Sequence, residues 1–568
     1  MQKTETQSNF FANKGNHKNP ITLVAKDIYL HIYLKIMILQ ISQHTDNHTI
    51  NLVLNTLSLN KQAIVFVNTK KSAEKTAEDI AKELKKRNEA STELDELSGK
   101  ILNCLQKPTK QCERLAYCIK HGIAFHHSGL VAEQRRFIEE NFRNHTIRII
   151  CATTTLAYGL DLPAYRTIIK DLRRYGYRGM AWIPVLEYLQ MAGRSGRPKY
   201  DTEGQAICIA ASDSERDEIE ERYINGKPEV IDSKLAVEPV LRTYLLSLIS
   251  ANFISTRDEI IEFFGKTFWA FHFKDMERLI EIIDRMLNLL QEWGFIITGA
   301  KSNKNEKDDS IESEFVSASD VIVDRFRATL IGRRVAELYI DPYSAHFLIE
   351  CINRDDRTRS LKPIALLQMI MRTNELRPLF SLRQKEYEIV EEILLKYDNH
   401  FLEPVPSMYE IDYEEYLDSV KTAIVFDEWI NEEDENNILE KYNVRPGELR
   451  GKIELADWML YATEEIARLS KQMEIISDIK KLRIRLRYGV KEELITLLRL
   501  DGIGRVRARK LYSNGIRNIA DIKNTELVKL TQILGDSLAK NIKKQVDEEI
   551  KPISLGRRKG QINLADYD

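Results

Sequence analysis

Five short, largely apolar runs alternate with helix-like stretches, and this alternation restricts the fold more than any other feature. The runs cover residues 63–67, 122–125, 147–152, 167–170 and 206–210. Strands that are apolar at every position are buried on both faces, and their alternation with helices is typical of a parallel sheet. A charged helix is predicted to follow the first run from Ser72 to residue 87, with Ser72 as its N-cap. The sequence therefore predicts one parallel α/β domain that ends near residue 230.

The rest of the chain is predicted to be mainly helical. Residues 236–300 are expected to form helices closed by a short apolar segment at 294–298, as in a small helical or winged-helix domain. Residues 320–490 are almost wholly helical by period, and residues 491–550 form a separate helical unit. A length of 568 residues is too long for one core. The predicted fold class is multidomain, α/β plus α.

Charge is unevenly distributed along the chain. The net charge is −2, but from Lys480 to the end 21 Lys and Arg residues stand against 11 Asp and Glu residues, so this region carries about +10. We infer an anionic partner for the C-terminal region.

Membrane, secreted and zinc proteins are disfavoured. Residues 21–41 are apolar but interrupted by charges, and residues 28–38 alternate as in a strand with one buried face. The six cysteines form no C-x-x-C pair, and no secretory signal is recognisable. Cys118, His126 and His127 match no common zinc spacing. We expect a reduced cytoplasmic protein, associated with the nucleoid, with no membrane partner and no metal ligands of its own.

The most specific segment reads Gln-Met-Ala-Gly-Arg-Ser-Gly-Arg-Pro over residues 190–198. Arg194 and Arg197 each follow a small residue and lie three positions apart, so both can point the same way. A planar guanidinium suits the charge that builds on a transferring γ-phosphoryl group. A basic surface turn is the alternative, but it gives no reason for the glycines.

A second segment, residues 151–164, leaves a strand and turns at Gly159. Thr155 and Asp161 lie in this segment, beyond the carboxyl end of a parallel strand, where ligands bind in such sheets. Two further strings precede it, Val-Phe-Val-Asn-Thr at 65–69 and His-His-Ser-Gly-Leu at 126–130.

In this order and spacing, the four strings closely resemble motifs IV to VI of superfamily 2 helicases. Within the Ski-like branch, they are most similar to the archaeal HelQ-type DNA helicases, over roughly residues 42–568. The resemblance implies that Arg194 and Arg197 are arginine fingers and that Gln190 helps to position the attacking water. It also implies that three residues lie beside the nucleotide: Gly159, Asp161 and Thr155. The family more often has Asn where Asp161 stands, although Asp occurs there in other helicase branches.

The resemblance also implies the order of domains. After an unmatched N-terminal segment it predicts a second RecA-like domain, a winged helix, a helical ratchet domain, a helix-hairpin-helix and a basic tail. The expected bounds are, in that order, 1–41, 42–230, 231–320, 321–490, 491–552 and 553–568.

A β-hairpin is predicted between the last two motifs. Residues 166–170 and 179–185 form its expected arms, and residues 173–178 form a basic and aromatic tip. In the family such a hairpin parts the duplex by stacking on the last base pair, and an ordinary connecting hairpin is the alternative. The tip residues expected to act in this way are Arg173, Tyr175 and Tyr177.

Residues 447–461 resemble the family's ratchet helix, where an aromatic stacks on single-stranded bases and an arginine grips the backbone. Trp458 matches the position of the aromatic. The expected arginine falls on Gly451, and its neighbour Arg450 lies about 100° away around the helix. Trp458 and Arg450 are the predicted DNA contacts, with an ordinary core tryptophan as the alternative.

Residues 500–511 carry a Gly-Ile-Gly turn before a basic helix start, which is a helix-hairpin-helix signature. Such glycines expose backbone N–H groups to a phosphate, and the basic side chains add attraction that is independent of base sequence. The predicted phosphate contacts are Gly502, Gly504, Arg505, Arg507 and Lys510.

The last residues contain a short peptide pattern. Gln561, Leu564 and Tyr567 follow a basic stretch and resemble the peptide by which repair proteins dock on the sliding clamp. The second aromatic of that peptide is missing, so a chance match is the alternative.

A helicase of this superfamily clamps ATP between two RecA-like domains. The first domain supplies G-x-x-x-x-G-K-[ST] and a magnesium-binding Asp-Glu box, and neither occurs in this sequence. Gly265-Lys266-Thr267 lacks the earlier glycine, since Ile260 stands there. ATP and Mg²⁺ are therefore expected to be bound mainly by a partner domain.

Two explanations for the missing motifs remain open. The gene is split, and a separate polypeptide supplies the first RecA domain, or the chain is a truncated product that only binds DNA. The expected function is part of an ATP-dependent 3′-5′ DNA helicase at forks or in repair, inactive alone, which acts on single-stranded or branched DNA. The alternatives are a DNA-binding protein without ATP turnover and, because Ski-like relatives act on RNA, an RNA helicase subunit.

Overall fold

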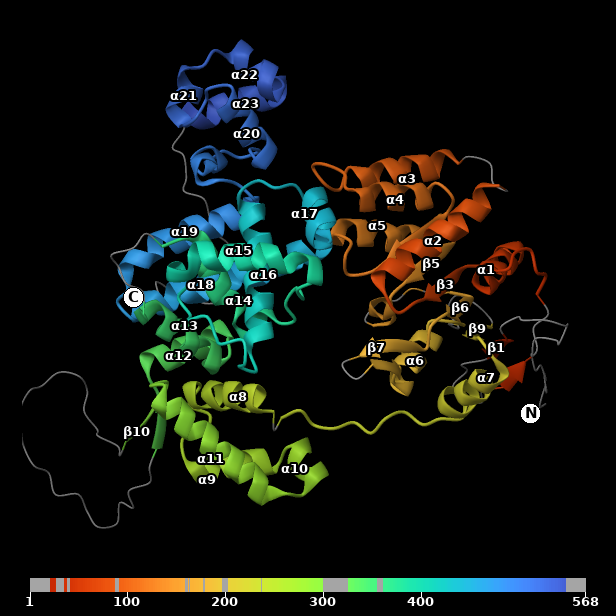
Figure 1. Ribbon diagram of the computed structural model, residues 1–568, viewed down its shortest axis with the longest axis horizontal. Helices are drawn as coiled ribbons and strands as arrows, with labels where there is room; N and C mark the ends of the chain where they lie inside the picture. The colour runs from red at the N-terminus through yellow and green to blue at the C-terminus, as the bar shows by residue number, and fades with distance from the viewer. Residues whose placement is uncertain are drawn as a thin grey trace, which may run out of the picture. The chain divides into compact units, whose positions relative to one another are not determined.

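The chain forms two compact units (Figure 1). The first consists of residues 1–230 and 444–450, and the second of residues 231–443 and 451–568. The computed structural model describes residues 21–26, 35–37, 41–86, 91–158, 162, 164–176, 179–196, 203–235, 237–299, 325–354 and 361–547.

A seven-stranded sheet lies at the centre of the first unit, with the order β2-β1-β9-β6-β3-β5-β4. The five strands β9, β6, β3, β5 and β4 run parallel to one another. Their bounds are β3 (Ala63–Phe66), β4 (Ile123–His126), β5 (Ile149–Ala152), β6 (Arg166–Ile169) and β9 (Gln205–Ala210). The predicted parallel α/β domain is confirmed.

Two antiparallel strands extend one edge of this sheet. β1 (Ile21–Lys26) pairs with β9, from Ile21 opposite Ala210 to Lys26 opposite Gln205, and β2 (Lys35–Met37) pairs with β1. The strand predicted at 28–38 overlaps only β2, and residues 27–34 lie outside the described residues. An added strand pairs the outer N–H and C=O groups that β9 would otherwise expose at the edge.

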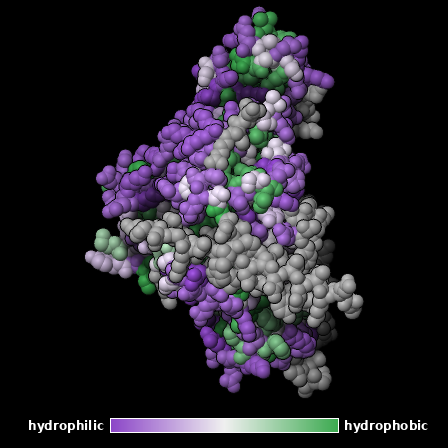
Figure 2. Space-filling view, turned by 90° about the vertical axis from the view of Figure 1, so that its right-hand side faces the viewer, coloured by the Kyte–Doolittle hydropathy of each residue, from purple (hydrophilic) through white to green (hydrophobic). Residues whose placement is uncertain are grey.

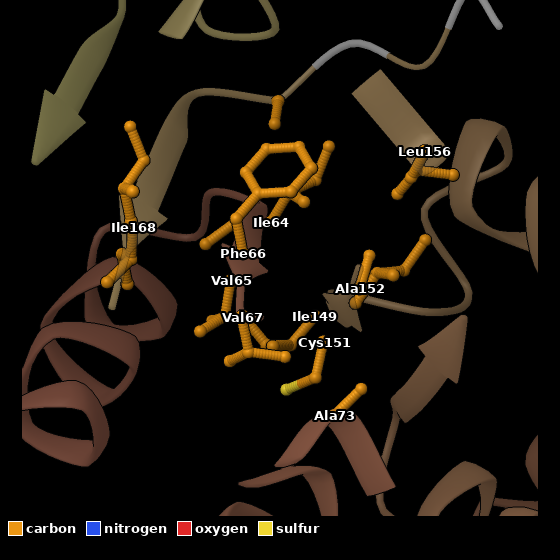
Figure 3. Close-up of a cluster of buried hydrophobic side chains, with 14 of the residues drawn as sticks. Ile64, Val65, Phe66, Val67, Ala73, Ile149, Cys151, Ala152, Leu156 and Ile168 are labelled. Carbon is orange, nitrogen blue, oxygen red and sulfur yellow. The ribbon is translucent and has the colours of Figure 1, made fainter. Parts of the chain in front are cut away.

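Both faces of the parallel sheet are covered. Every residue of β3, β4, β5 and β6 is buried, and successive strand residues point to opposite faces. Side chains such as Phe66, Ile149 and Ile168 form the cluster in Figure 3. The helices of this unit are α1 (His48–Ser58), α2 (Lys70–Lys85), α3 (Thr92–Leu102), α4 (Lys110–Ile119), α5 (Ala132–Arg143), α6 (Val185–Ala192) and α7 (Asp213–Ile219).

Two local predictions need correction. Helix α2 begins at Lys70, so Thr69 rather than Ser72 is its N-cap, and the Thr69 side chain accepts a hydrogen bond from the backbone N–H of Ser72 at 3.0 Å. The predicted first arm of the hairpin, residues 166–170, is instead mostly β6 of the main sheet. The hairpin consists of β7 (Arg173–Gly176) and β8 (Gly179–Trp182), paired from Arg173 opposite Trp182.

The second unit begins with a helical group and a two-stranded antiparallel ribbon. α8 packs against α11, and the side chain of Thr256 caps α9 in a reciprocal capping box with Glu259. The assignment of this group as a winged helix stays a prediction. Its elements are α8 (Glu238–Ser250), α9 (Arg257–Gly265), α10 (Phe268–Phe273), α11 (Met276–Glu292), β10 (Ile296–Gly299) and β11 (Arg325–Ala328).

Helices make up the remainder of the described chain, as predicted. The first group is α12 (Leu330–Leu338), α13 (Pro342–Arg354), α14 (Pro363–Met371), α15 (Tyr387–Tyr397), α16 (Tyr413–Ile430), α17 (Glu435–Tyr442), α18 (Pro446–Leu469) and α19 (Met473–Tyr488). A separate hydrophobic core that includes Leu511, Leu530 and Ile542 holds the last group together. That group is α20 (Arg505–Ser513), α21 (Ile519–Asn524), α22 (Leu527–Leu534) and α23 (Asp536–Asp547).

The described surface carries no sign of a membrane helix or a metal cluster. None of the described helices has both the length and the apolar character needed to cross a membrane. Among the coloured residues in Figure 2, most are hydrophilic and the apolar ones lie in small groups. Within the described ranges, no group of three His, Cys, Asp or Glu side chains is placed to hold a metal ion.

Candidate functional site

The helix in which the arginine string begins, α6, is anchored at its first turn. Pro184 is the N-cap of α6, and its side chain has no acceptor for the first backbone N–H groups of the helix. The Glu229 carboxylate does so instead, accepting from Val185 N–H at 2.6 Å and from Leu186 N–H at 3.0 Å. A negative charge at a helix N-terminus is also favoured by the helix dipole. Glu229 therefore holds α6 in position from outside the motif.

Arg194 lies two residues beyond the end of α6 and is only 7% exposed. Its guanidinium donates a hydrogen bond to the carbonyl of Ala157, the last residue of the 3₁₀ turn η1 (Thr154–Ala157) that follows β5. Its own carbonyl accepts from Ala164 N–H at 3.2 Å. Burial lowers the pKa of Arg194. The arginine string is therefore attached directly to the second motif.

One predicted nucleotide-binding residue, Thr155, and two predicted catalytic residues, Gln190 and Arg194, lie on or beside neighbouring elements. Thr155 is exposed on η1, Gln190 is exposed on α6, and these two elements pack against each other close to Arg194. A hydroxyl, an amide and a guanidinium are donors that fit an anionic nucleotide, whereas none of the three would hold Mg²⁺ through a carboxylate. Gly159, Asp161 and Arg197 lie outside the described residues.

The described part of the hairpin carries exposed side chains and is attached to α6. Tyr175 is 83% exposed, and the Arg173 guanidinium lies 4.0 Å from the ring centre of Trp182 on the opposite arm. Arg174, which sequence reasoning did not single out, pairs with the buried Glu187 of α6 at 3.0 Å. This ion pair connects the hairpin to the helix that leads to Arg194. Tyr177 is not among the described residues.

The candidate ratchet residues have different environments. Trp458 is half-buried on α18, and its indole N–H donates a hydrogen bond to the Leu338 carbonyl at 3.1 Å. Leu338 ends α12. Arg450 is exposed near the start of α18. Trp458 is therefore neither fully exposed nor a fully buried core residue.

The helix-hairpin-helix turn has the predicted glycine geometry. Gly502 has a φ of +86°, which favours glycine, and Gly504 is the N-cap of α20. Arg507 and Lys510 are exposed.

Arg505, in contrast, already has partners within its own unit. Its guanidinium lies 4.8 Å from the ring centre of Trp429 and donates to the Glu433 carbonyl at 2.8 Å. A phosphate contact by Arg505 would compete with these contacts. The predicted clamp peptide, with Gln561, Leu564 and Tyr567, lies outside the described residues.

A buried charged cluster in the first unit was not expected from the sequence. Glu74 of α2 is 3% exposed, and its two oxygens lie 2.9 Å from Arg445 Nε and 2.6 Å from Arg114 Nη1. His127 Nε2 lies 3.3 Å from the same oxygen as Arg445. His127 Nδ1 accepts the backbone N–H of Gly129 at 3.1 Å, so the ring proton sits on Nε2 and faces Glu74.

The first unit is expected to lose stability in acid because of Glu74. Burial favours the neutral carboxyl, but hydrogen bonds and charge from His127 and Arg445 outweigh it and lower the pKa from 4.5 to about 2. A lowered pKa contributes stability that is complete above the ordinary pKa and is lost as the pH falls through the lowered one. The contribution is roughly 3 kcal/mol. Hydrogen exchange of the β3 and β5 peptides between pH 6 and pH 3 measures it, and equal slopes for the wild type and Glu74→Gln would contradict it.

Three family models match parts of the chain. "Helicase conserved C-terminal domain" matches residues 46–199, "Archaeal helicase, domain 4" matches residues 364–489, and "SAM-like Helix-hairpin-helix tandem" matches residues 494–548. The first contains the parallel strands β3, β4, β5 and β6 with the four motif strings but ends before β9, and the second contains α18. The third contains the turn with Gly502 and Gly504.

Relatives named as DNA helicases are similar over most of the chain. The ATP-dependent DNA helicase Hel308 of Methanocella arvoryzae is 36% identical over 507 residues, which is 88% of this chain and 65% of that protein. Hel308 of Pyrococcus horikoshii is 35% identical over 514 residues, or 89% and 67% of the two chains. Hel308 of Methanococcus vannielii is 34% identical over 546 residues, or 92% and 69%. The chain thus spans about two thirds of the length of these relatives, and it belongs to the Hel308 family of archaeal superfamily 2 helicases.

Proposed function

We propose that this chain supplies the second motor domain and the DNA-gripping domains of an ATP-dependent DNA helicase. The helicase moves 3′ to 5′ along single strands and opens stalled forks or repair intermediates. A first RecA-like domain on a separate polypeptide binds the ATP phosphates and Mg²⁺, and Arg194 and Arg197 reach the γ-phosphate from this side. The last residues dock on a sliding clamp.

One observation carries this proposal: the arginine string is built into a motor sheet. Arg194 is bonded to the turn after β5, and Thr155 and Gln190 flank it on exposed positions. A guanidinium held in this way would cost little reorganisation when charge develops on the γ-phosphate. The sequence contains no G-x-x-x-x-G-K-[ST] string, so the other half of the ATP site has to come from outside these 568 residues.

The test is reconstitution. DNA-stimulated ATP hydrolysis is measured for the 568-residue chain alone, for a separately produced first RecA-like domain from a relative, and for their mixture. Turnover and unwinding of a forked duplex that appear only in the mixture would support the proposal. DNA binding without turnover in any sample would instead leave a DNA-binding protein derived from a helicase.

Trp458 is expected to contribute to single-stranded DNA affinity mainly through its aromatic face. Trp458→Ala removes the ring and should weaken binding of an oligo-dT strand about 10- to 100-fold, because base stacking contributes about 1–3 kcal/mol per base. Trp458→Phe keeps an aromatic face but loses the hydrogen bond to Leu338. It should retain most of the affinity.

Fluorescence anisotropy with labelled oligo-dT measures both variants, and thermal melting controls for folding. Equal losses in the alanine and phenylalanine variants would show that the N–H bond to Leu338, rather than stacking, is what binding requires.

A further inference from the structure

Residues 444–450 contact the motor sheet's own loops and belong to the first unit. The backbone N–H of Gly447 donates to the carbonyl of Gly129 at 3.0 Å. The approach is so close that a Cβ on Gly447 would lie 2.2 Å from the Leu130 carbonyl oxygen. A Cβ on Gly129 would lie 2.3 Å from the Cδ of Arg445. The contact therefore requires glycine at 447, where a methyl group would meet backbone that cannot yield, whereas at 129 a methyl group would displace the buried Arg445 side chain.

Buried and partly buried charges surround this glycine contact. Arg445 is 8% exposed and pairs with Glu74, which His127 and Arg114 also face. Three residues after Arg445, the Glu448 carboxylate accepts the backbone N–H of Arg445 at 3.0 Å and pairs with Lys70 at the start of α2. Separation of the segment from the sheet would leave Glu74 or Arg445 without its partner in a poorly hydrated place, which is strongly unfavourable.

The same segment is the first turn of a helix with a predicted DNA contact. α18 begins at Pro446 and continues unbroken to Leu469, and its residues from 451 onward belong to the second unit. Trp458 lies about 18 Å along the helix from Pro446. A continuous helix transmits a tilt or rotation of its first turn to the residues further along.

We propose that the Gly129–Gly447 contact and the Glu74 cluster form a rigid joint through which the second motor domain moves the helix that carries Trp458. This rests on the proposed function, since it needs a motor that moves and a helix that grips DNA. Glu74, His127 and Arg445 are then positioning residues of the motor. They touch neither nucleotide nor DNA, and they convert domain movement into movement of α18.

The first test needs neither ATP nor DNA. Gly447→Ala places a methyl group against the Leu130 carbonyl, whereas Gly451→Ala adds the same group in the same helix where nothing lies within 4 Å. In hydrogen exchange on the full chain, Gly447→Ala should speed exchange of residues 127–131 and 445–449 about tenfold or more. Gly451→Ala should leave both peptides unchanged. Indistinguishable exchange in the two variants would overturn the joint.

Arg445→Ala serves as a second variant in case Gly447→Ala disturbs folding. It removes a charge partner of Glu74 without adding an atom, and it should speed exchange of the same two peptides. Unchanged exchange in the β3 and β5 peptides confirms that the sheet itself is intact. Protection of residues 445–449 equal to the wild type in Arg445→Ala would also count against the joint.

The second test asks whether the joint transmits binding. If α18 and the motor are coupled, oligo-dT bound to the wild type should slow exchange of residues 127–131 about fivefold, because coupling between sites is reciprocal. In Gly447→Ala the affinity for oligo-dT should be kept and this slowing should vanish. If Gly447 had only a structural role, its replacement would change the oligo-dT affinity and the slowing of exchange together. Slowing that persists in Gly447→Ala would overturn the proposal.

The two proposals fail in different ways. Failure of the wild type to bind oligo-dT would remove the proposed function, while the DNA-free exchange of Gly447→Ala and Gly451→Ala would still decide whether the joint exists. Conversely, if Gly447→Ala leaves unwinding by the reconstituted helicase unaffected, the proposed function stands and the joint is refuted.

Discussion

Arg194→Ala is expected to lower ATP turnover of the reconstituted motor about a thousandfold or more. A guanidinium that reaches the γ-phosphoryl group neutralises charge that exists only in the transition state, and such arginines contribute about 10³ to 10⁵ in rate. The structure anchors Arg194 through Ala157, so its removal also frees a carbonyl at the end of η1. Steady-state ATP hydrolysis with saturating oligo-dT measures the loss.

Further variants distinguish a catalytic role of Arg194 from a purely structural one. Arg194→Lys keeps a charge but not the planar fork, so it should recover little of the rate, whereas a purely structural anchor would be largely restored. Gln190→Ala, at an exposed position on α6, should cost less because it is predicted to orient water rather than carry charge. Full turnover in Arg194→Ala together with loss in Arg197→Ala would assign the finger role to Arg197 alone.

The coarse fold of the first unit was predictable because its signals are local. Each parallel strand is a short apolar run, and the motifs lie at the ends of these strands in a fixed order. The glycine turn of the last helical group was equally visible, since Gly502 and Gly504 lie two residues apart. Patterns within a few residues predict elements and turns well.

Exact boundaries were less predictable. Ser72 and Thr69 are both good caps, and only the hydrogen bond from Ser72 N–H to Thr69 decides between them. Residues 167–170 are predicted both as a strand of the sheet and as part of the first hairpin arm, because an extended run has the same sequence pattern in either. The pairing of β6 with β3 and β9 resolves this.

No sequence pattern predicts the contacts between distant parts of the chain. Glu74 and Arg445 are 371 residues apart, and each looks like one charged residue among many. Charged side chains are usually solvated, so no pattern rule would have placed either in the interior. The ion pair of Arg174 with Glu187 spans only 13 residues, but no sequence pattern predicts that it connects the hairpin to α6.

Arg166 is the strongest case of an unexpected interior residue, and its replacement by alanine is expected to destabilise the first unit by about 3–5 kcal/mol. The side chain at the start of β6 is fully buried. Its Nε and Nη2 donate to Gln205 Oε1 at 2.9 and 2.6 Å. Its Nη1 reaches the Leu52 carbonyl at 3.1 Å, Asn55 Oδ1 at 2.9 Å and Thr56 Oγ1 at 2.8 Å.

The acceptors around Arg166 are all neutral, so the guanidinium is held by hydrogen bonds rather than by an ion pair. Burial lowers its pKa to about 10, and it therefore remains charged at neutral pH. The acceptors from Leu52 to Thr56 all lie in α1, whereas Gln205 begins β9. One side chain thus joins a surface helix to two strands of the sheet.

The size of the loss follows from what alanine leaves behind. The acceptors would face a cavity without a donor, and each unsatisfied buried polar group costs about 1–3 kcal/mol. Arg166→Met fills most of the space without supplying a donor. It should therefore destabilise the first unit less than Arg166→Ala does, but still measurably. Arg136→Ala, at an exposed position on α5, should cost under about 0.5 kcal/mol.

Peptide-resolved hydrogen exchange in increasing urea is the appropriate measurement, because a chain of two units does not unfold in one step. The α1, β6 and β9 peptides should lose protection together in Arg166→Ala, while peptides of α20 to α23 stay unchanged. If Arg166→Met were as stable as the wild type, the hydrogen bonds would only offset the cost of burying the charge. The arginine would then fix where α1 sits on the sheet without adding to its stability.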